Sequence, residues 1–276
     1  HDARRQRQMC IRDSLKSVSY LKGLGNIFQR VKRIEEVTKN ILTFLNDKSL
    51  EDKKIIEAAR FCKNDLCSEI VFEFPELQGI MGGKYLKNEG FSEDVCLAVA
   101  EHYLPSFYKD ALPSSKYGAI VSVADKIETL ISIFISGKRP SGSSDPYALR
   151  RNLNGVIKII WDYELDLPLE KLFNELIDFW KIEFPNLDFS KKEVLNDLIE
   201  FLVQRIVSHL EEISLSKELI KALYSSDEFS QKRILNIVDL KNRVKSIVNF
   251  KEKETFFEIQ KVCLLYTSPS PRDHQP

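Results

Sequence analysis

The sequence has little of what would assign a function at sight. Glycine and proline occur only ten times each in 276 residues, which excludes collagen-like and low-complexity chains and disfavours a β-rich fold full of tight turns. Apolar runs such as residues 118–124 fall far short of the ~20 residues of a membrane span, so we expect no membrane association. Basic and acidic residues number 41 each, so a polyanionic partner would have to be bound by a local patch.

Cysteine and histidine are equally sparse. The five cysteines are an odd, scattered set, which predicts reduced thiols in a cytoplasmic protein rather than a disulfide framework. The sequence contains no H-E-x-x-H motif and no paired C-x-x-C motif, so a zinc site is not expected. A Ser-His-Asp triad could use only His102 or His209 of the chain interior, and neither lies near a nucleophile elbow.

The two ends of the chain differ from the rest. Residues 1–14 and 263–276 follow no helical or strand period and resemble translated sequencing-adapter sequence. We treat both as non-native tails and leave them out of the fold prediction. The remaining interior has 36 basic and 38 acidic residues, a formal charge of −2. If the tails are non-native, the chain is expected to be a fragment of a longer protein.

The interior is patterned for helices almost throughout. Apolar residues from Ile27 to Leu45 recur three, four and seven positions apart, which predicts an amphipathic helix. Loops are expected at 78–83 and 137–145, where glycine recurs. Since no convincing period-2 strand is present, the predicted fold class is all-α. Further helices are predicted at 49–71, 92–103, 113–136, 145–161, 169–180, 194–210, 218–224 and 234–248.

The first glycine loop invites comparison with a phosphate-binding loop. Gly79, Gly83 and Lys84 form G-x-x-x-G-K, but the motif is one residue short, lacks the Ser or Thr that binds magnesium, and follows a helix instead of a strand. A turn that needs the backbone freedom of glycine is therefore the preferred interpretation.

Two acidic residues stand where a phosphohydrolase of the HD type would bind its metal. Residues 58–66 have the apolar helical context of the His-Asp dyad of that family, and residues 121–127 resemble the helix with its last metal-binding Asp. On this interpretation Asp65 and Asp125 are ligand positions, but Asn64 replaces the dyad histidine and the upstream histidine is absent as well. Such sites need imidazole ligands beside carboxylates. We therefore expect a vestigial HD-like site without metal.

Several strings, in conserved order and spacing, resemble the β subunit of the bacterial heterotetrameric glycyl-tRNA synthetase. The resemblance covers residues 21–262, with a modest departure at Leu24-Gly25, where the family usually continues with Ser-Leu. The strings that carry it are Cys62-Lys-Asn-Asp-Leu66, Val71-Phe-Glu-Phe-Pro-Glu-Leu-Gln-Gly-Ile-Met-Gly82, Glu101-His-Tyr-Leu-Pro105, Ala124-Asp-Lys-Ile-Glu-Thr-Leu130 and Pro140-Ser-Gly-Ser-Ser-Asp-Pro-Tyr-Ala-Leu-Arg-Arg151.

This resemblance implies a cytoplasmic α2β2 enzyme that attaches glycine to its tRNA with ATP. The α subunit would form the adenylate, and the β subunit would handle the tRNA, so the expected partners are the α subunit and tRNA(Gly). No catalytic residue, metal or cofactor is expected in this chain itself. The implied domains are a degenerate HD-like helical domain at 15–165, a helical extension at 166–235, and the start of a truncated anticodon-binding domain at 236–262.

The candidates for tRNA contact are Lys138, Arg139, Arg150 and Arg151. They flank a flexible loop and a helix start, and both guanidinium groups and N-terminal backbone amides suit phosphate. The simpler alternative is that Arg150 and Arg151 are ordinary surface charges or pair with Asp145. Two other functions stay open on sequence alone: a metal-dependent HD-type phosphohydrolase, and a helical scaffold that binds the α subunit without contacting RNA.

Overall fold

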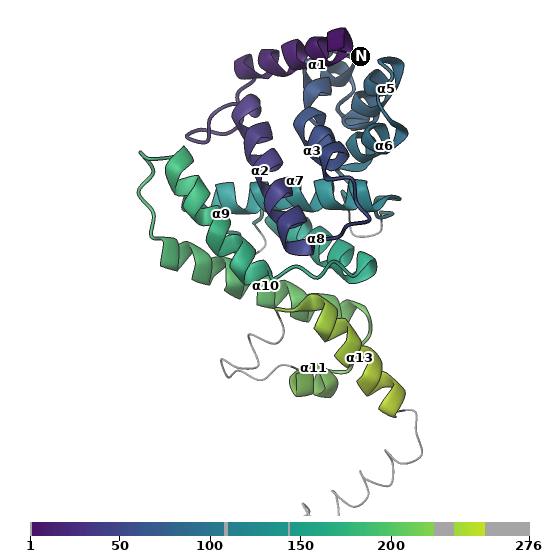
Figure 1. Ribbon diagram of the computed structural model, residues 1–276. Coiled ribbons are helices and arrows are strands. Elements are labelled where there is room, and N and C mark those ends of the chain that lie inside the picture. The colour runs from purple at the N-terminus through teal and green to yellow at the C-terminus, as the bar shows by residue number, and fades with distance from the viewer. Residues whose placement is uncertain (1, 108–109, 143, 224–234, 252–276) are drawn as a thin grey trace, which may run out of the picture.

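The computed structural model describes residues 2–107, 110–142, 144–223 and 235–251, and these form helices without a strand (Figure 1). The predicted all-α class is confirmed. The first half contains α1 (Asp2–Ser14), α2 (Ile27–Leu45), α3 (Asp52–Phe61), α4 (Glu69–Glu73), α5 (Ile80–Asn88), α6 (Glu93–Glu101) and α7 (Lys116–Ile135). Short 3-10 turns η1 (Leu15–Ser17), η2 (Asn64–Cys67) and η3 (Pro75–Leu77) connect them. The second half contains α8 (Leu149–Tyr163), α9 (Leu169–Glu183), α10 (Lys191–Glu212), α11 (Lys217–Leu223) and α13 (Ile237–Lys251).

Helix α7 is the centre of the bundle. Its sequence is apolar on nearly every side, as in a helix that is surrounded by others, and almost all of its residues from Gly118 onward are buried. Helices α2, α3, α6, α8, α9 and α10 all contact it. Figure 1 shows α7 crossing the middle of the molecule, with α1, α3, α5 and α6 above it, α10, α11 and α13 below it, and α2 passing over it.

Local signals in the sequence set most helix ends. Asn26 and Gln29 form a reciprocal capping box at the start of α2. The Ser115 side chain accepts from the backbone N–H of Gly118 at the start of α7. Gly137, with φ at +75°, follows the end of α7 as predicted.

Three predicted boundaries are wrong. The helix expected at 49–71 is broken at Cys62 into α3, η2 and α4. The loop expected at 78–83 contains the start of α5, which begins directly after Gly79. The helix expected from Asp145 begins at Leu149, because Ala148 has a left-handed backbone (φ +53°) that a helix cannot include.

One hydrophobic core runs from Leu24 in the first half to Val244 in α13. The indole N–H of Trp180 in α9 donates to Ser132 Oγ of α7 at 2.9 Å, so the second half is joined to the bundle centre by a buried polar contact as well. The domain boundaries at 165 and 235 remain predictions, and the core crosses both. No helix among the described residues is long and apolar enough to cross a membrane.

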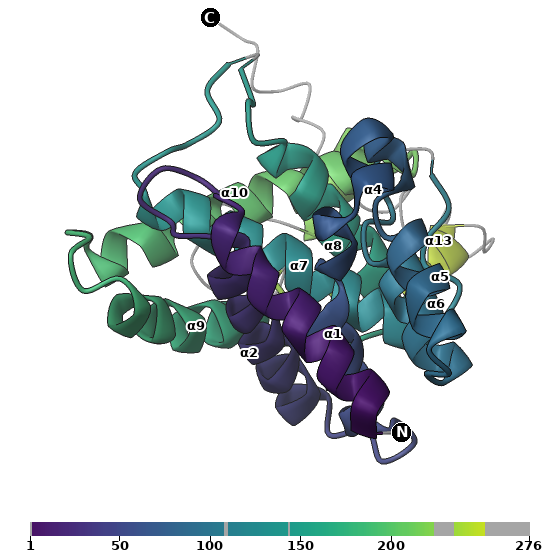
Figure 2. The same ribbon diagram turned by 90° about the horizontal axis from the view of Figure 1, so that it is seen from above.

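Residues 2–14 form a helix and are not the unstructured tail that their pattern suggested. Helix α1 lies across α2 (Figure 2), and Gln8 is buried where its carbonyl and side-chain oxygens accept from Asn64. The non-native origin of this segment stays a prediction. The other tail, 263–276, lies outside the described residues, as does the stretch 252–262 of the expected anticodon-binding domain.

Candidate functional site

The structure separates the three residues of the predicted vestigial HD-like site. Asn64 bonds to Gln8 of α1, away from Asp125. Asp65 accepts from the backbone N–H groups of Gly79 at 2.6 Å and Gly82 at 3.2 Å, where it fixes the start of α5. Burial raises the pKa of Asp65 in spite of these bonds. The backbone N–H groups of this glycine segment thus bind a carboxylate of the same chain. Gly79, with φ at +80°, has the backbone conformation that the interpretation as a glycine turn requires, whereas Gly83 lies within α5.

Asp125 of α7 faces cations instead of a second carboxylate. One of its oxygens accepts from Arg30 Nη2 at 2.8 Å and the other from Lys63 Nζ at 2.9 Å. Burial acts to raise the pKa of Asp125, but the charges of Arg30 and Lys63 outweigh it and hold the pKa well below its usual value. Beside Asp125, where the resemblance to an HD-type site placed Asn64 and Asp65, the structure therefore has Lys63.

His102 completes this buried cluster without providing a metal ligand. Its Nδ1 lies 2.6 Å from the carbonyl oxygen of Val99, which only accepts, so Nδ1 carries the proton and Nε2 accepts from Lys63 at 2.8 Å. Burial, reinforced by the Lys63 charge, lowers the pKa of His102 well below its usual value. Among the described residues, no group of three or more His, Cys, Asp or Glu is placed to hold a metal.

The network continues along α2 and α7. Glu128 is fully buried and accepts from Arg30 at 3.0 Å, from Arg33 at 2.8 Å and from Ser132 at 2.8 Å. In an intact HD-type site, the upstream histidine that this sequence lacks would stand within residues 30–33 of α2, where the chain has two arginines instead. Their spacing of three along α2, facing two acidic residues three apart on α7, was the available signal.

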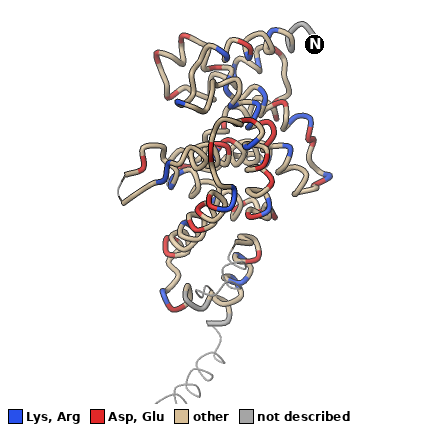
Figure 3. The backbone as a smooth tube through the Cα atoms, turned by 90° about the vertical axis from the view of Figure 1, so that its left-hand side faces the viewer, with Lys and Arg blue, Asp and Glu red and all other residues tan. Residues whose placement is uncertain are grey.

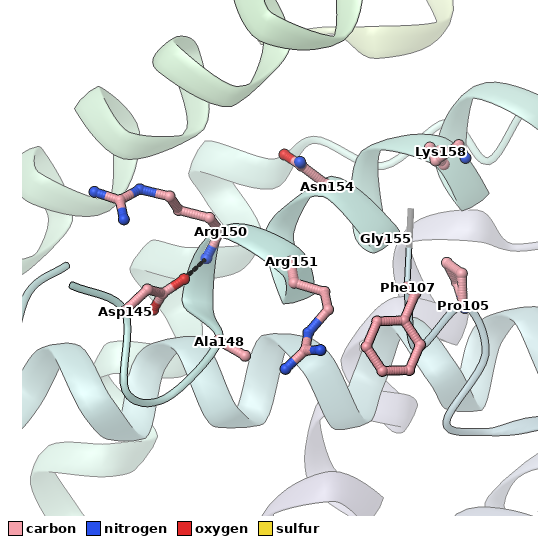
Figure 4. Close-up of a pocket in the computed structure, with 9 residues that line it drawn as sticks. All are labelled: Pro105, Phe107, Asp145, Ala148, Arg150, Arg151, Asn154, Gly155 and Lys158. Atoms are coloured by element: carbon pink, nitrogen blue, oxygen red, sulfur yellow. Dashed lines mark hydrogen bonds between the residues drawn. The ribbon is translucent and has the colours of Figure 1, made fainter. Parts of the chain in front are cut away.

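A second feature, which we call the α8 pocket, is a surface cavity of about 400 Å³ beside the first turns of α8 (Figure 4). Its lining combines one aromatic ring with three basic side chains. Its lining residues are Pro105, Phe107, Asp145, Ala148, Arg150, Arg151, Asn154, Gly155 and Lys158.

Asp145 lines this pocket and caps the start of α8. Its carboxylate accepts from the N–H groups of Leu149 at 2.8 Å and Arg150 at 2.9 Å, which neutralises two free donors of the helix start. The predicted alternative, a pair between Asp145 and the arginine side chains, does not occur. Asp145 therefore positions Arg150 and Arg151 while their guanidinium groups remain available.

The two arginine side chains diverge from the start of α8. Figure 4 shows Arg150 extending to one side and Arg151 lying between the backbone and the ring of Phe107. The Arg151 guanidinium is 5.0 Å from the Phe107 ring centroid, a cation–π distance. Neither side chain forms an ion pair with a carboxylate among the described residues. Arg205 of α10 adds a third cation, and burial together with the nearby charge of Arg150 lowers its pKa.

Lys138 and Arg139 do not share this availability. Arg139 donates to Asp197 of α10 through Nε at 2.8 Å and Nη2 at 2.7 Å, and to the Phe134 carbonyl at the end of α7. It therefore closes α7 and joins it to α10. Lys138 donates to the hydroxyl of Tyr147 at 2.7 Å. The four-residue basic patch predicted from sequence divides into two residues with structural partners and two in the α8 pocket.

The base of the α8 pocket depends on a glycine. A Cβ at Gly155 would lie 2.9 Å from Cε of Lys126, so any larger residue here would displace the end of that buried side chain. Lys126 is buried beneath it and donates to the carbonyls of Tyr103 and Leu104 at 3.1 Å and to Ser122 Oγ at 2.8 Å. Burial lowers the pKa of Lys126 to about 7.

Charge elsewhere on the molecule is mixed. In the view of Figure 3, Lys and Arg are interspersed with Asp and Glu along the backbone of the described residues. In the α8 pocket, Arg150 and Arg151 have no carboxylate partner among the described residues, on a chain with no net charge. A local patch of this kind is what the composition required of any site for a polyanion.

Comparison with known proteins supplies the context for this geometry. Residues 2–225 match the model of the family described as glycyl-tRNA synthetase beta subunit. A glycine–tRNA ligase beta subunit of Trichodesmium erythraeum is 38% identical over 241 residues, which are 86% of this chain and 33% of the relative. That of Thermodesulfovibrio yellowstonii is 37% identical over 89% of this chain and 34% of the relative, and that of Phenylobacterium zucineum is 43% identical over 61% and 25%. The chain spans about a third of the length of the first two relatives.

Proposed function

The chain belongs to the family of glycyl-tRNA synthetase beta subunits, and on this premise we propose that it is the tRNA-handling helical part of a glycine–tRNA ligase. The whole enzyme would be a cytoplasmic α2β2 heterotetramer that attaches glycine to tRNA(Gly) at the expense of ATP. Adenylate formation belongs to the α subunit in this proposal. The present chain contributes RNA contacts and no catalytic residue, metal or cofactor of its own.

Family membership is the observation that carries the proposal, and the α8 pocket gives it a location. The relatives are named beta subunits, which indicates that they act beside at least one other kind of subunit. In the present chain, Arg150 and Arg151 lie on the surface without carboxylate partners among the described residues. Guanidinium groups of this kind bind phosphate through paired N–H donors, and the first turn of α8 carries both residues although their side chains diverge.

The phosphohydrolase alternative is not favoured. In a metal site, carboxylate oxygens would be directed at a cation from solution, whereas both oxygens of Asp125 accept from cationic side chains of the protein. Those bonds would have to break before Asp125 could bind a divalent ion. The charges of Arg30 and Lys63 would also repel the ion at close range.

The proposal is tested by the salt dependence of tRNA binding. Each phosphate contact that is lost should flatten the slope of log affinity against log salt by about 0.7–0.9. We expect Arg150→Ala with Arg151→Ala to weaken binding of the chain to a tRNA(Gly) transcript and to lower the slope by about one to two. Helix content should hardly change, because Ala is a better helix former than Arg.

A matched control removes the same charge elsewhere. Lys53 in α3 and Lys192 in α10 are both exposed, so Lys53→Ala with Lys192→Ala should leave the slope nearly unchanged. If the arginine variant retains the wild-type slope, Arg150 and Arg151 are ordinary surface residues. If the wild-type chain does not bind the transcript, alone or with the α subunit present, the scaffold alternative is supported instead.

A further inference from the structure

The α8 pocket contains more than a phosphate site requires. A patch that binds only a phosphate backbone needs cations and N–H donors, but this cavity also has an exposed aromatic ring as one wall and a half-buried amide, that of Asn154, in its lining. We infer that the pocket takes one unpaired nucleotide of RNA, with its base stacked on Phe107 and its phosphate bound by Arg151. This inference rests on the proposed function and specifies the ligand of the same site.

Phe107 has the properties of a stacking platform. Its side chain is 63% exposed, which is unusual for a residue whose apolar surface favours burial. Its backbone is nevertheless fixed, because Asp110 Oδ2 accepts from the N–H of Phe107 at 2.7 Å and from that of Ser106 at 3.0 Å. A ring held in this way can stack on a base at little entropic cost. Stacking of this kind tolerates any base, since every base has a π face.

Arg151 is placed to bind the phosphate of the same nucleotide. Its guanidinium lies 5.0 Å from the centroid of the Phe107 ring and has no carboxylate partner among the described residues. Arginine beside an aromatic ring is the combination that single-stranded nucleic-acid sites use, with cation–π contact and phosphate binding from one side chain. Figure 4 shows both side chains on the same side of α8.

Asn154 favours a nucleotide over a simple anion. It lines the pocket, and its Oδ1 is buried without a hydrogen-bond partner in the structure. A buried amide oxygen requires a donor. A phosphodiester or sulfate offers only acceptors at neutral pH, whereas the exocyclic amino groups of adenine, cytosine and guanine are donors. The cavity, at about 400 Å³, lies in the ~300–1,000 Å³ range of small-ligand sites.

The nucleotide must be unpaired, because its base has to place one face against the Phe107 ring and its pairing edge inside the cavity. In an A-form duplex both faces of an internal base are covered by its neighbours, and its pairing edge is occupied. A duplex could meet Arg150 and Arg151 through its phosphates but could not reach Phe107 with a base. Stacking therefore distinguishes the two ligands, and charge does not.

The experiment measures binding of two labelled RNA probes to the full chain: a single-stranded oligonucleotide and a blunt duplex that contains it. Phe107→Leu keeps an apolar side chain but removes the π face, and we expect it to weaken single-strand binding roughly 5- to 150-fold, the cost of one lost base stack. Duplex binding and the salt slope should not change. Phe107→Trp should retain single-strand affinity, and its fluorescence should be quenched when the oligonucleotide binds.

The outcomes separate this inference from the function on which it rests. If the arginine variant lowers the salt slope but Phe107→Leu weakens neither probe, the chain binds RNA through phosphates alone and the nucleotide pocket is refuted. Equal losses on both probes would also refute it, because a duplex cannot stack on the ring. If the arginine variant has no effect on either probe, the proposed function fails at this site. Far-UV circular dichroism of each variant establishes that the fold is intact.

Discussion

Replacement of Asp125 by Asn tests whether the buried charge cluster is a stabilising part of the fold. The substitution keeps the size of the side chain and removes the negative charge between Lys63 and Arg30. Arg30 retains Glu128 as a partner. Lys63 would then have only neutral partners, which are the amide oxygen of the new Asn, the imidazole of His102 and the face of the Tyr103 ring, whose centroid is 3.7 Å from Nζ.

The expected loss follows from that remaining environment. Lys63 and Asp125 are both buried, and removal of one partner of a buried pair leaves an uncompensated charge at a cost of about 3–5 kcal/mol. A domain of ordinary stability, about 5–15 kcal/mol, would stay folded but become marginal. Removal of the cation as well should recover part of the loss, so Lys63→Met with Asp125→Asn should be about 1–3 kcal/mol more stable than Asp125→Asn alone.

Urea denaturation at neutral pH, followed by far-UV circular dichroism, measures the free energy of unfolding for the wild type, both single variants and the double variant. Two results would contradict the reasoning. One is a loss below about 1 kcal/mol for Asp125→Asn, which would mean that the cluster is hydrated or rearranges freely. The other is simple additivity, which would mean that Lys63 and Asp125 do not interact in the folded state.

Two further predictions concern pH and metal. Because burial lowers the pKa of Lys126 from 10.5 to about 7, the unfolded chain binds more protons than the folded chain between these pH values. The stability that the protein has with a neutral Lys126 is therefore complete above pH 10.5 and is lost as the pH falls toward 7. The unfolding free energy of wild type should thus rise with pH between about 7.5 and 10 more steeply than that of Lys126→Met, by up to ~1.4 kcal/mol per pH unit, and parallel curves would show that Lys126 titrates normally. The purified chain should contain no stoichiometric metal, hydrolyse neither nucleotides nor phosphodiesters, and support no ATP–pyrophosphate exchange with glycine; elemental analysis and activity assays check this, and bound iron, manganese or zinc with turnover would overturn it.

Local patterns in the sequence were sufficient for the helical class and for many helix ends. The apolar spacing of α2 and the near-continuous apolar run of α7 each describe a helix by its own residues, since the helical period is set by the backbone alone. The caps at Asn26 and Ser115 act within three residues. These features depend on short separations, so they could be read before any tertiary contact was known.

The start of α5 shows why other boundaries could not be read in the same way. Residues 78–83 look like a loop because three of them are glycine. A helix begins there because Asp65, 14 residues earlier, accepts from the free N–H of Gly79. A carboxylate at a helix start satisfies donors that the helix itself leaves open. The sequence around Gly79 does not indicate this cap, because the capping residue, Asp65, belongs to η2.

The vestigial HD-like site was displaced for a similar reason. In a continuous helix through 58–66, Asp65 would share the buried face of Ala58 and Cys62, but the chain leaves α3 at Phe61 and enters η2. The change of helical phase directs Lys63 to Asp125 and turns Asp65 toward α5. A shift of one or two residues in the backbone thus exchanges a carboxylate for an ammonium group at the same place.

By itself, the sequence determined the all-α class, the resemblance to a family and a short list of cations. Tertiary structure alone decided which of those cations have partners. Arg139 pairs with Asp197, 58 residues away in the chain, whereas the carboxylate nearest to Arg150 in sequence, Asp145, is used by backbone N–H groups. The aromatic ring beside Arg151 comes from residue 107, on the far side of α7 in the sequence. Charges pair through space and not along the chain. Which cations stay without a partner is therefore known only from the tertiary structure.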